Sequence, residues 1–225
     1  MSTLKTLDRG LKALWIIGKS PGGLSAVQLA QALDVDRAIA YRIVSTLESH
    51  RLVARRGDGR LVLGAAVLEL DARFQPQFRQ EAEPLLARLA EATRATAFIS
   101  VAEGDDCTAI VVSEPDNVLL RVGYRVGSTH PLNKGAAGLA ILAGRAESAG
   151  DSNEIREARA QGYAVTRGIL QPGAIGVASP ILSGHAASGA MEASVGVVAM
   201  EDLDVALAAR QVASCAKALA ALLDR

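Results

Sequence analysis

The side chains best suited to chemistry lie on one face of a short segment, residues 36–47. In DRAIAYRIVSTL four apolar residues recur at helical spacing and are expected to face a core: Ala40, Ile43, Val44 and Leu47. The opposite face then carries polar and small side chains: Arg37, Ala38, Tyr41, Arg42 and Ser45. Cations bind phosphates or guanine, a hydroxyl reaches a base edge, and a methyl side chain fits a thymine methyl. We predict a recognition helix, although a plain helical hairpin with a solvated face would show the same periodicity.

The residues before this segment predict the helix and the turn that would position it. Ser25 and Gln28 have the spacing of a capping box, so a first helix is expected to begin there. Asp34 falls at the turn, and aspartate tolerates the left-handed backbone region. Asp36 is expected to cap the second helix. Residues 25–47 therefore read as a helix-turn-helix, with Ser25 counted among the DNA-contacting residues.

Further elements on both sides complete the module. Leucines at positions 4, 7, 11 and 14 predict an earlier helix, ended by the turn residues of Lys19–Gly23, as the third member of a small bundle. After the recognition helix, two β-prone runs flank Gly57-Asp58-Gly59 and predict a hairpin. Three arginines crowd its tip: Arg55, Arg56 and Arg60. This is the pattern of a winged helix-turn-helix whose wing arginines lie along the phosphate backbone.

Composition and charge support two modules of different kinds. Half of the 225 residues are hydrophobic, and only 3% are aromatic, which argues against stacking platforms for single-stranded nucleic acid. Residues 1–64 hold ten Lys and Arg against five Asp and Glu, whereas the remainder holds fourteen against nineteen. A basic small module joined to an acidic larger one suits a DNA reader attached to a second function. With no targeting segment or long uncharged apolar run, a cytoplasmic protein without membrane association is expected.

Catalytic and metal-binding chemistry finds little support in the sequence. Three histidines are present, at positions 50, 130 and 185, and none has metal-ligand spacing. Nucleophile-elbow, phosphate-loop and dinucleotide motifs are absent from the sequence. Cys107 and His130 could pair as nucleophile and base after folding, but a buried thiol and a structural histidine are the simpler interpretation. We expect no catalytic residue, no metal, no cofactor, and no disulfide between Cys107 and Cys215.

Several segments in fixed order resemble the IclR family of bacterial transcriptional regulators. They include RGLKALWIIG, the helix-turn-helix segment, GRLVLGAAVLEL, EPLLARLAEAT, PLNKGAAGLAILA and GYAV…LQPGAIGVASPI. The resemblance covers nearly the whole chain. It implies a DNA-binding domain at 1–64, a linker helix at 65–76, and a GAF-like effector-binding and oligomerisation domain at 77–225. It also implies a homodimer or homotetramer, joined through the first and linker helices, on a pseudo-palindromic double-stranded operator.

The pattern after residue 95 independently predicts an α+β domain built on an antiparallel sheet. Strands are expected at 96–102, 107–113, 117–123, 176–182 and 193–200. Helices are expected at 134–143, 153–161 and 204–223.

One segment, residues 130–142, is the candidate ligand site of this domain. Asn133 is placed to cap a helix whose first turn, at Gly135 and Ala136, carries almost no side chain, and a bare helix start attracts anions. Close packing against the sheet would equally explain small residues there. The resemblance places effector contacts in this region, and the walls would then come from small or apolar residues with few polar ones: Val122, Asn133, Gly135, Ala136, Ala137, Thr166, Arg167, Ala174, Gly176 and Gly196. Such a site favours a small organic acid.

The segment Thr166–Gln171 departs from the family pattern. Family members usually carry acidic residues in the loop that closes over the effector, whereas this segment has none and offers Arg167 instead. The departure weakens any expectation of a metal in the pocket. The alternative to a DNA-binding regulator is a small-molecule enzyme, or a sensor that does not bind DNA, built on the second domain.

Overall fold

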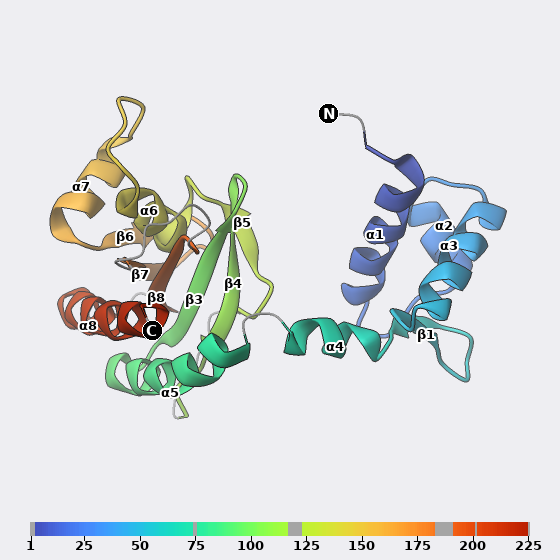
Figure 1. The fold of residues 1–225 in the computed structure, drawn as a ribbon, viewed down its shortest axis with the longest axis horizontal. Coiled ribbons are helices and arrows are strands. Elements are labelled where there is room, and N and C mark those ends of the chain that lie inside the picture. The colour runs from blue at the N-terminus through green and yellow to red at the C-terminus, as the bar shows by residue number, and fades with distance from the viewer. Residues whose placement is uncertain (1–2, 74–75, 117–122, 183–190, 201, 225) are drawn as a thin grey trace. The chain divides into compact units, whose positions relative to one another are not determined.

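The chain folds as two compact units, Met1–Pro76 and Gln77–Arg225 (Figure 1). The computed structural model describes residues 3–73, 76–116, 123–182, 191–200 and 202–224. The first unit is mostly helical with a small hairpin, and the second combines a six-stranded sheet with helices. The fold class is therefore α+β, as the sequence pattern predicts.

The first unit is a three-helix bundle followed by a hairpin and a short helix. Its elements are α1 (Lys5–Gly18), α2 (Ala26–Ala32), α3 (Arg37–Ser49), β1 (Val53–Arg55), β2 (Leu61–Leu63) and α4 (Ala66–Ala72). Strands β1 and β2 pair antiparallel, with Val53 opposite Leu63. The apolar faces of the three helices and Leu61 of the hairpin form one core. This packing gives the first unit the architecture of a winged helix-turn-helix.

Local interactions fix the start of α2 and the turn before α3. The Ser25 hydroxyl accepts the Gln28 N–H, and the Gln28 side chain accepts the Ser25 N–H, which confirms the predicted capping box. Asp34 has φ 50°, the left-handed conformation expected at the turn. Asp36 is the N-cap residue of α3, but its side chain makes no cap hydrogen bond, so that detail of the prediction is wrong.

The leucine stripe of α1 lies mostly at the surface, along a groove beside α3, and only Leu14 packs against the core. Leu4, Leu7 and Leu11 are 76%, 58% and 51% exposed, whereas Ala13 and Ile17 are buried. The periodic leucines correctly predict a helix. The face that packs most closely on α2 and α3 carries Ala13 and Ile17.

The second unit is built on one six-stranded antiparallel sheet in the order β5-β4-β3-β8-β7-β6. Its strands are β3 (Thr96–Glu103), β4 (Asp106–Ser113), β5 (Thr129–Pro131), β6 (Ala164–Arg167), β7 (Ala174–Ile181) and β8 (Ala193–Met200). Its helices are α5 (Pro76–Thr93), α6 (Gly135–Gly144), α7 (Asn153–Gln161) and α8 (Val205–Leu223). β5 and β6 lie at the two edges, and neither short strand is predicted by the sequence pattern. The strand expected at 117–123 falls almost entirely outside the described residues.

Helices cover the sheet in two layers with separate cores. One core joins α5 and α8 to the sheet, and the other joins α6 and α7 to the opposite face (Figure 1). Within the described part of the chain, α8 alone is long and apolar enough to cross a membrane by length and composition. It carries Arg210 and Lys217, and its Val212 and Leu219 are fully buried in the first core, so it is a core helix of this domain.

Candidate DNA interface and ligand pocket

The outer face of α3 carries every side chain assigned to it from the sequence. Ala40, Ile43, Val44 and Leu47 are buried, as the periodicity predicts. The side chains predicted to contact DNA are all exposed: Arg37, Ala38, Tyr41, Arg42 and Ser45. A rigid helix thus presents two guanidinium groups, a phenol and a hydroxyl to solvent on one side. This arrangement suits hydrogen bonding to base edges and phosphates.

Ser25 caps α2 and is also a predicted DNA contact. Its oxygen accepts the Gln28 N–H at 3.2 Å. A serine hydroxyl that accepts one hydrogen bond still has its own O–H to donate. The cap is therefore compatible with a phosphate contact at the start of α2.

The three wing arginines differ in what they contact within the chain. Arg55 pairs with Glu48 of α3 at 3.3 Å and donates to the Gly59 carbonyl. Arg60 donates to the Gly23 carbonyl at 3.2 Å and lies 3.7 Å from Asp58. Arg56 is exposed and has no ion-pair partner among the described residues. Two of the arginines therefore help to hold the wing in place, and Arg56 is the one most available to a phosphate.

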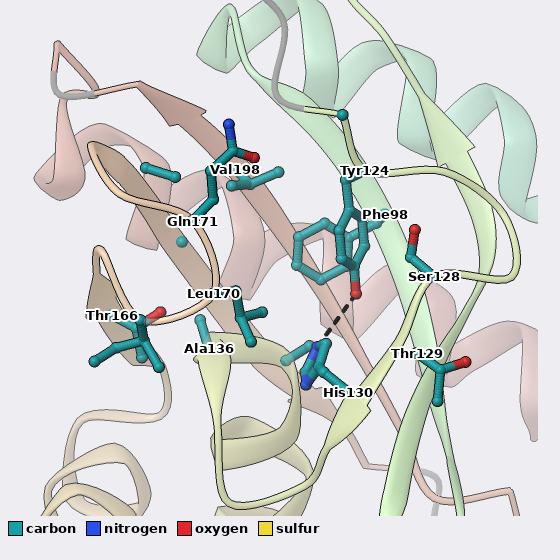
Figure 2. A pocket seen from close by; sticks show the side chains of 15 residues that line it. Phe98, Tyr124, Ser128, Thr129, His130, Ala136, Thr166, Leu170, Gln171 and Val198 are labelled. Carbon is teal, nitrogen blue, oxygen red and sulfur yellow. Dashed lines mark hydrogen bonds between the residues drawn. The ribbon is translucent and has the colours of Figure 1, made fainter.

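A pocket of about 280 Å³ opens between the start of α6 and the facing strands (Figure 2). Apolar walls come from Phe98 of β3, Val198 of β8, and Ile169 and Leu170 of the loop after β6. Ile169 and Leu170 are 58% and 48% exposed, so this loop puts apolar surface at the pocket and in contact with water. The volume is near the lower end of the range for small-molecule sites. The pocket suits a small, largely apolar ligand.

Five of the ten predicted effector-binding residues line this pocket: Ala136, Ala137, Thr166, Ala174 and Gly176. Thr166 and Gly176 are register partners on β6 and β7. A Cβ atom at Gly176 would lie 3.3 Å from both the Ala136 Cβ and the Thr166 Oγ1. Small residues at these positions therefore keep the space open.

Four others lie outside the lining for identifiable reasons. Arg167 follows Thr166 in β6, so its side chain points to the opposite face and is exposed. Gly196 lies against the aromatic ring of Phe98, and a Cβ atom at this position would be 2.6 Å from the Phe98 Cζ. Asn133 is exposed and does not cap α6, whose N-cap residue is Lys134. Gly135 has φ 75° and lets Leu170 lie against the helix start. Val122 lies outside the described residues.

The start of α6 is buried and lacks a cap. Gly135, Ala136 and Ala137 are buried, and their N–H groups have no hydrogen-bond acceptor among the described residues. Buried helix starts normally satisfy these donors with a side chain, water or a ligand. The loop that the sequence places at Thr166–Gln171 begins only at Gly168, because Thr166 and Arg167 belong to β6.

Two polar side chains that were not predicted as pocket residues, Tyr124 and His130, form its polar end. The Tyr124 hydroxyl lies 3.4 Å from His130 Nε2 (Figure 2). It also lies 3.3 Å from the Ser100 hydroxyl. His130 is 8% exposed, and its Nδ1 lies 3.1 Å from the Pro131 carbonyl oxygen. Burial raises the pKa of Tyr124 to about 12, so the phenol is neutral at pH 7. The remaining lining residues missed from the sequence are Gly123, Ser128, Thr129 and Gln171, together with the apolar walls named above.

Cys107 stands opposite His130 in the β4–β5 pair, but the two do not make a nucleophile and base. The thiol is completely buried, and this burial raises its pKa to about 11. A thiol that stays protonated at neutral pH is a poor nucleophile. Within the described residues, no group of three or more His, Cys, Asp or Glu side chains is placed to hold a metal ion.

The first unit matches a known family of DNA-binding domains. Residues 6–57 match the profile of the IclR helix-turn-helix domain. Over 144 residues the chain is 27% identical to the transcriptional repressor IclR of Escherichia coli K12. Residues 6–57 therefore form a helix-turn-helix domain of the IclR family. The curated relatives of this chain are named as transcriptional repressors and regulators.

The IclR fold extends over the whole chain. An IclR regulator from Alicyclobacillus acidocaldarius superposes with a TM-score of 0.81 at 21% identity, covering 100% of both chains. An IclR homologue from Microbacterium hydrocarbonoxydans, solved with 4-hydroxybenzoate, gives 0.82 at 20% identity over 97% of this chain and 98% of that one. The match to the Escherichia coli repressor covers 62% of this chain and about half, 53%, of that protein.

Proposed function

We propose that this protein is a cytoplasmic transcriptional regulator that binds double-stranded operator DNA through α3 and the wing. The observation that carries the proposal is the division of α3 into a buried apolar face and an exposed face holding Arg37 and Arg42. The capped start of α2 and the turn at Asp34 hold that face rigidly. The IclR match over residues 6–57 includes α2, the turn at Asp34 and α3.

The exposed apolar side chains support binding as a homo-oligomer on a pseudo-palindromic operator. Leu4, Leu7 and Leu11 line one exposed face of α1, and a groove of about 760 Å³ runs between α1 and α3. Leu68 and Leu70 of the linker helix α4 are 70% and 63% exposed. Clustered exposed leucines mark association sites. A single winged module also offers little contact area, so two copies on paired half-sites are expected, as a dimer or a pair of dimers.

The pocket beneath α6 is proposed as the effector site, with a small organic acid as ligand. Its apolar walls would hold a carbon skeleton, and its polar groups, Tyr124, His130 and the first N–H groups of α6, would hold a carboxylate. The Microbacterium hydrocarbonoxydans homologue solved with 4-hydroxybenzoate supports this ligand class. Binding would regulate DNA affinity only if the acid prefers one arrangement of the oligomer.

A gel-shift experiment tests the DNA-binding proposal. The full chain is titrated against labelled intergenic DNA from beside its own gene, with a scrambled duplex of equal length as competitor. We expect a shifted band that survives excess scrambled DNA and weakens steeply as salt rises. Equal competition by specific and scrambled DNA would favour a sensor that does not bind DNA specifically.

A further inference from the structure

The polar end of the pocket is a directed row of hydrogen bonds. The Pro131 carbonyl only accepts, so the His130 Nδ1 that lies 3.1 Å from it must carry a hydrogen. In a neutral ring the other nitrogen, Nε2, then holds a lone pair. The Tyr124 hydroxyl at 3.4 Å donates to that lone pair (Figure 2). The Ser100 hydroxyl lies 3.3 Å from the same phenol oxygen. In this state neither His130 Nε2 nor the Tyr124 hydrogen is available to a ligand anion.

The described lining of the pocket offers no fixed charge to an anion. It contains no Asp, Glu, Lys or Arg, and its titratable members are Tyr124 and His130. On β4, the fully buried Cys107 thiol pairs opposite His130, and the exposed Asp106 pairs opposite Pro131. The exposed Lys134 directly precedes α6, and the apolar Leu170 belongs to the loop after β6.

Burying a carboxylate beside a neutral imidazole lone pair is costly, because the anion would face an acceptor and no cation. Adding a proton to Nε2 removes both problems. The ring then donates from Nε2 to the carboxylate while Nδ1 keeps its bond to the Pro131 carbonyl. The Tyr124 hydroxyl no longer donates to Nε2, so its hydrogen is free to bond to the same carboxylate.

We propose that a carboxylic acid binds this pocket as its anion and that His130 takes up one proton from solvent as it binds. The inference rests on the proposed effector site and specifies how that site recognises its ligand. Water or buffer gives up the proton, which forms the Nε2–H bond. The resulting imidazolium cation and the carboxylate anion then balance each other's charge. A neutral amide of the same shape needs no proton, because its N–H group replaces the Tyr124 hydroxyl as the donor to Nε2 and its carbonyl accepts from that hydroxyl.

The proposal predicts a pH dependence for acids alone. Where the free ring is neutral, uptake of one proton weakens acid binding by up to tenfold for each unit of pH increase. An isosteric amide binds with the same affinity throughout. The pocket would therefore favour acids over amides most strongly in mildly acidic conditions.

Isothermal titration calorimetry of the full chain with benzoate and benzamide tests this inference. Titrations at pH 6, 7 and 8, repeated in buffers of different ionisation enthalpy, give the dissociation constant and the number of protons taken up. For benzoate we expect close to one proton at pH 8 and a dissociation constant about tenfold higher at pH 8 than at pH 7. Benzamide should take up none.

Three variants assign the proton to the ring. His130→Gln keeps a neutral donor, so it should bind benzoate without proton uptake and with little pH dependence. Tyr124→Phe should weaken benzoate but keep the uptake. His50→Gln, at an exposed histidine after α3, is the matched control and should behave as the parent chain.

The possible results separate this inference from the effector site itself. Benzoate that binds without proton uptake, or uptake that persists in His130→Gln, overturns the inference and leaves the effector site standing. If benzoate and 4-hydroxybenzoate both fail to bind at every pH, the inference and the acid-sensing part of the proposed function fail together. Thermal unfolding of each variant confirms that the domain remains folded.

Discussion

At the scale of single residues, the pocket exists because its walls carry almost no side chain where α6 meets the sheet. Ala136 and Ala137 on the helix face Thr166 and Gly176 on the strands. The Ala136 methyl group already lies within 3.3 Å of where a Cβ atom on Gly176 would stand. A large side chain at Ala136 or at Gly176 would occupy the cavity.

We predict that Ala136→Trp abolishes ligand binding and leaves DNA binding intact. The indole exceeds the room left by a methyl group in a pocket of about 280 Å³, so it displaces the ligand. Calorimetry with benzoate measures ligand binding, and a gel shift on the same preparation measures DNA binding. Ala206→Trp, at an exposed position of α8, is the control and should change neither. Normal ligand binding by Ala136→Trp would mean that the effector binds elsewhere.

Among the wing arginines, Arg56→Ala should weaken DNA binding equally for all sequences. Arg56 has no ion-pair partner among the described residues, so its charge is free to displace a counterion at a phosphate. We expect the slope of log affinity against log salt to fall by about 1 and stability to change by less than about 0.5 kcal/mol. Arg60→Ala should also disturb the wing, since Arg60 donates to the Gly23 carbonyl. An unchanged slope in Arg56→Ala would remove the wing tip from the interface.

The sequence predicts the small residues of the pocket better than its large ones. Ala136 and Gly176 stand out because small side chains beside a helix start suggest an open site. Phe98 looks like any core residue of a strand. Tyr124 and His130 meet across the turn at Arg125–Ser128 that precedes β5. A three-residue edge strand leaves no alternation to detect.

At the scale of elements, α6 is held at its carboxyl end by an arginine from α7. Arg159 donates to the carbonyls of Leu142 and Ala143 at 3.3 and 3.2 Å, and its other nitrogen lies 2.8 Å from Asp151. Cations at a helix carboxyl terminus satisfy its free carbonyls and oppose the helix dipole. Arg159 thus helps to fix the helix whose other end forms the pocket.

Arg159→Ala should destabilise the second unit by about 1–3 kcal/mol, because several hydrogen bonds to a charged, mostly buried group are lost together. Far-UV circular dichroism during urea unfolding follows the loss of secondary structure in both units. Fluorescence of Trp15, the single tryptophan, reports the first unit, which should unfold as in the parent chain. Arg156→Ala, an exposed neighbour on α7, is the control. An equal loss in both variants would show that Arg159 has no special part in holding α6.

Elements with strong local signals were predictable, and those that depend on distant pairing were not. The capping box specifies the start of α2, and Asn153–Gln161 reads as a helix from its own residues. Strand β6 escaped prediction because four residues are too few to show a period and its partner β7 supplies the pairing. The sequence placed the leucines of α1 on one face correctly but could not tell which face the bundle buries.

At the scale of the whole molecule, the exposed leucines of α1 are expected to join two copies. We predict that Leu7→Glu raises the dissociation constant of the dimer at least tenfold, because it removes apolar burial and places an unpaired carboxylate in the interface. Sedimentation velocity over a range of concentrations measures the effect. Gln31→Glu adds the same charge at an exposed site on α2 and should leave association unchanged. A Leu7→Glu chain that still dimerises like the parent would place the interface elsewhere.

The central claim is that the exposed face of α3 reads operator sequence. Fluorescence anisotropy with labelled upstream DNA, comparing the parent chain and Arg42→Ala on the intact operator and on single-base variants, tests it most directly. Loss of a bidentate base contact should cost Arg42→Ala about 1–3 kcal/mol on the intact operator and make it indifferent to substitution at one base position. Unchanged affinity and unchanged sequence preference in a folded Arg42→Ala chain would contradict the claim.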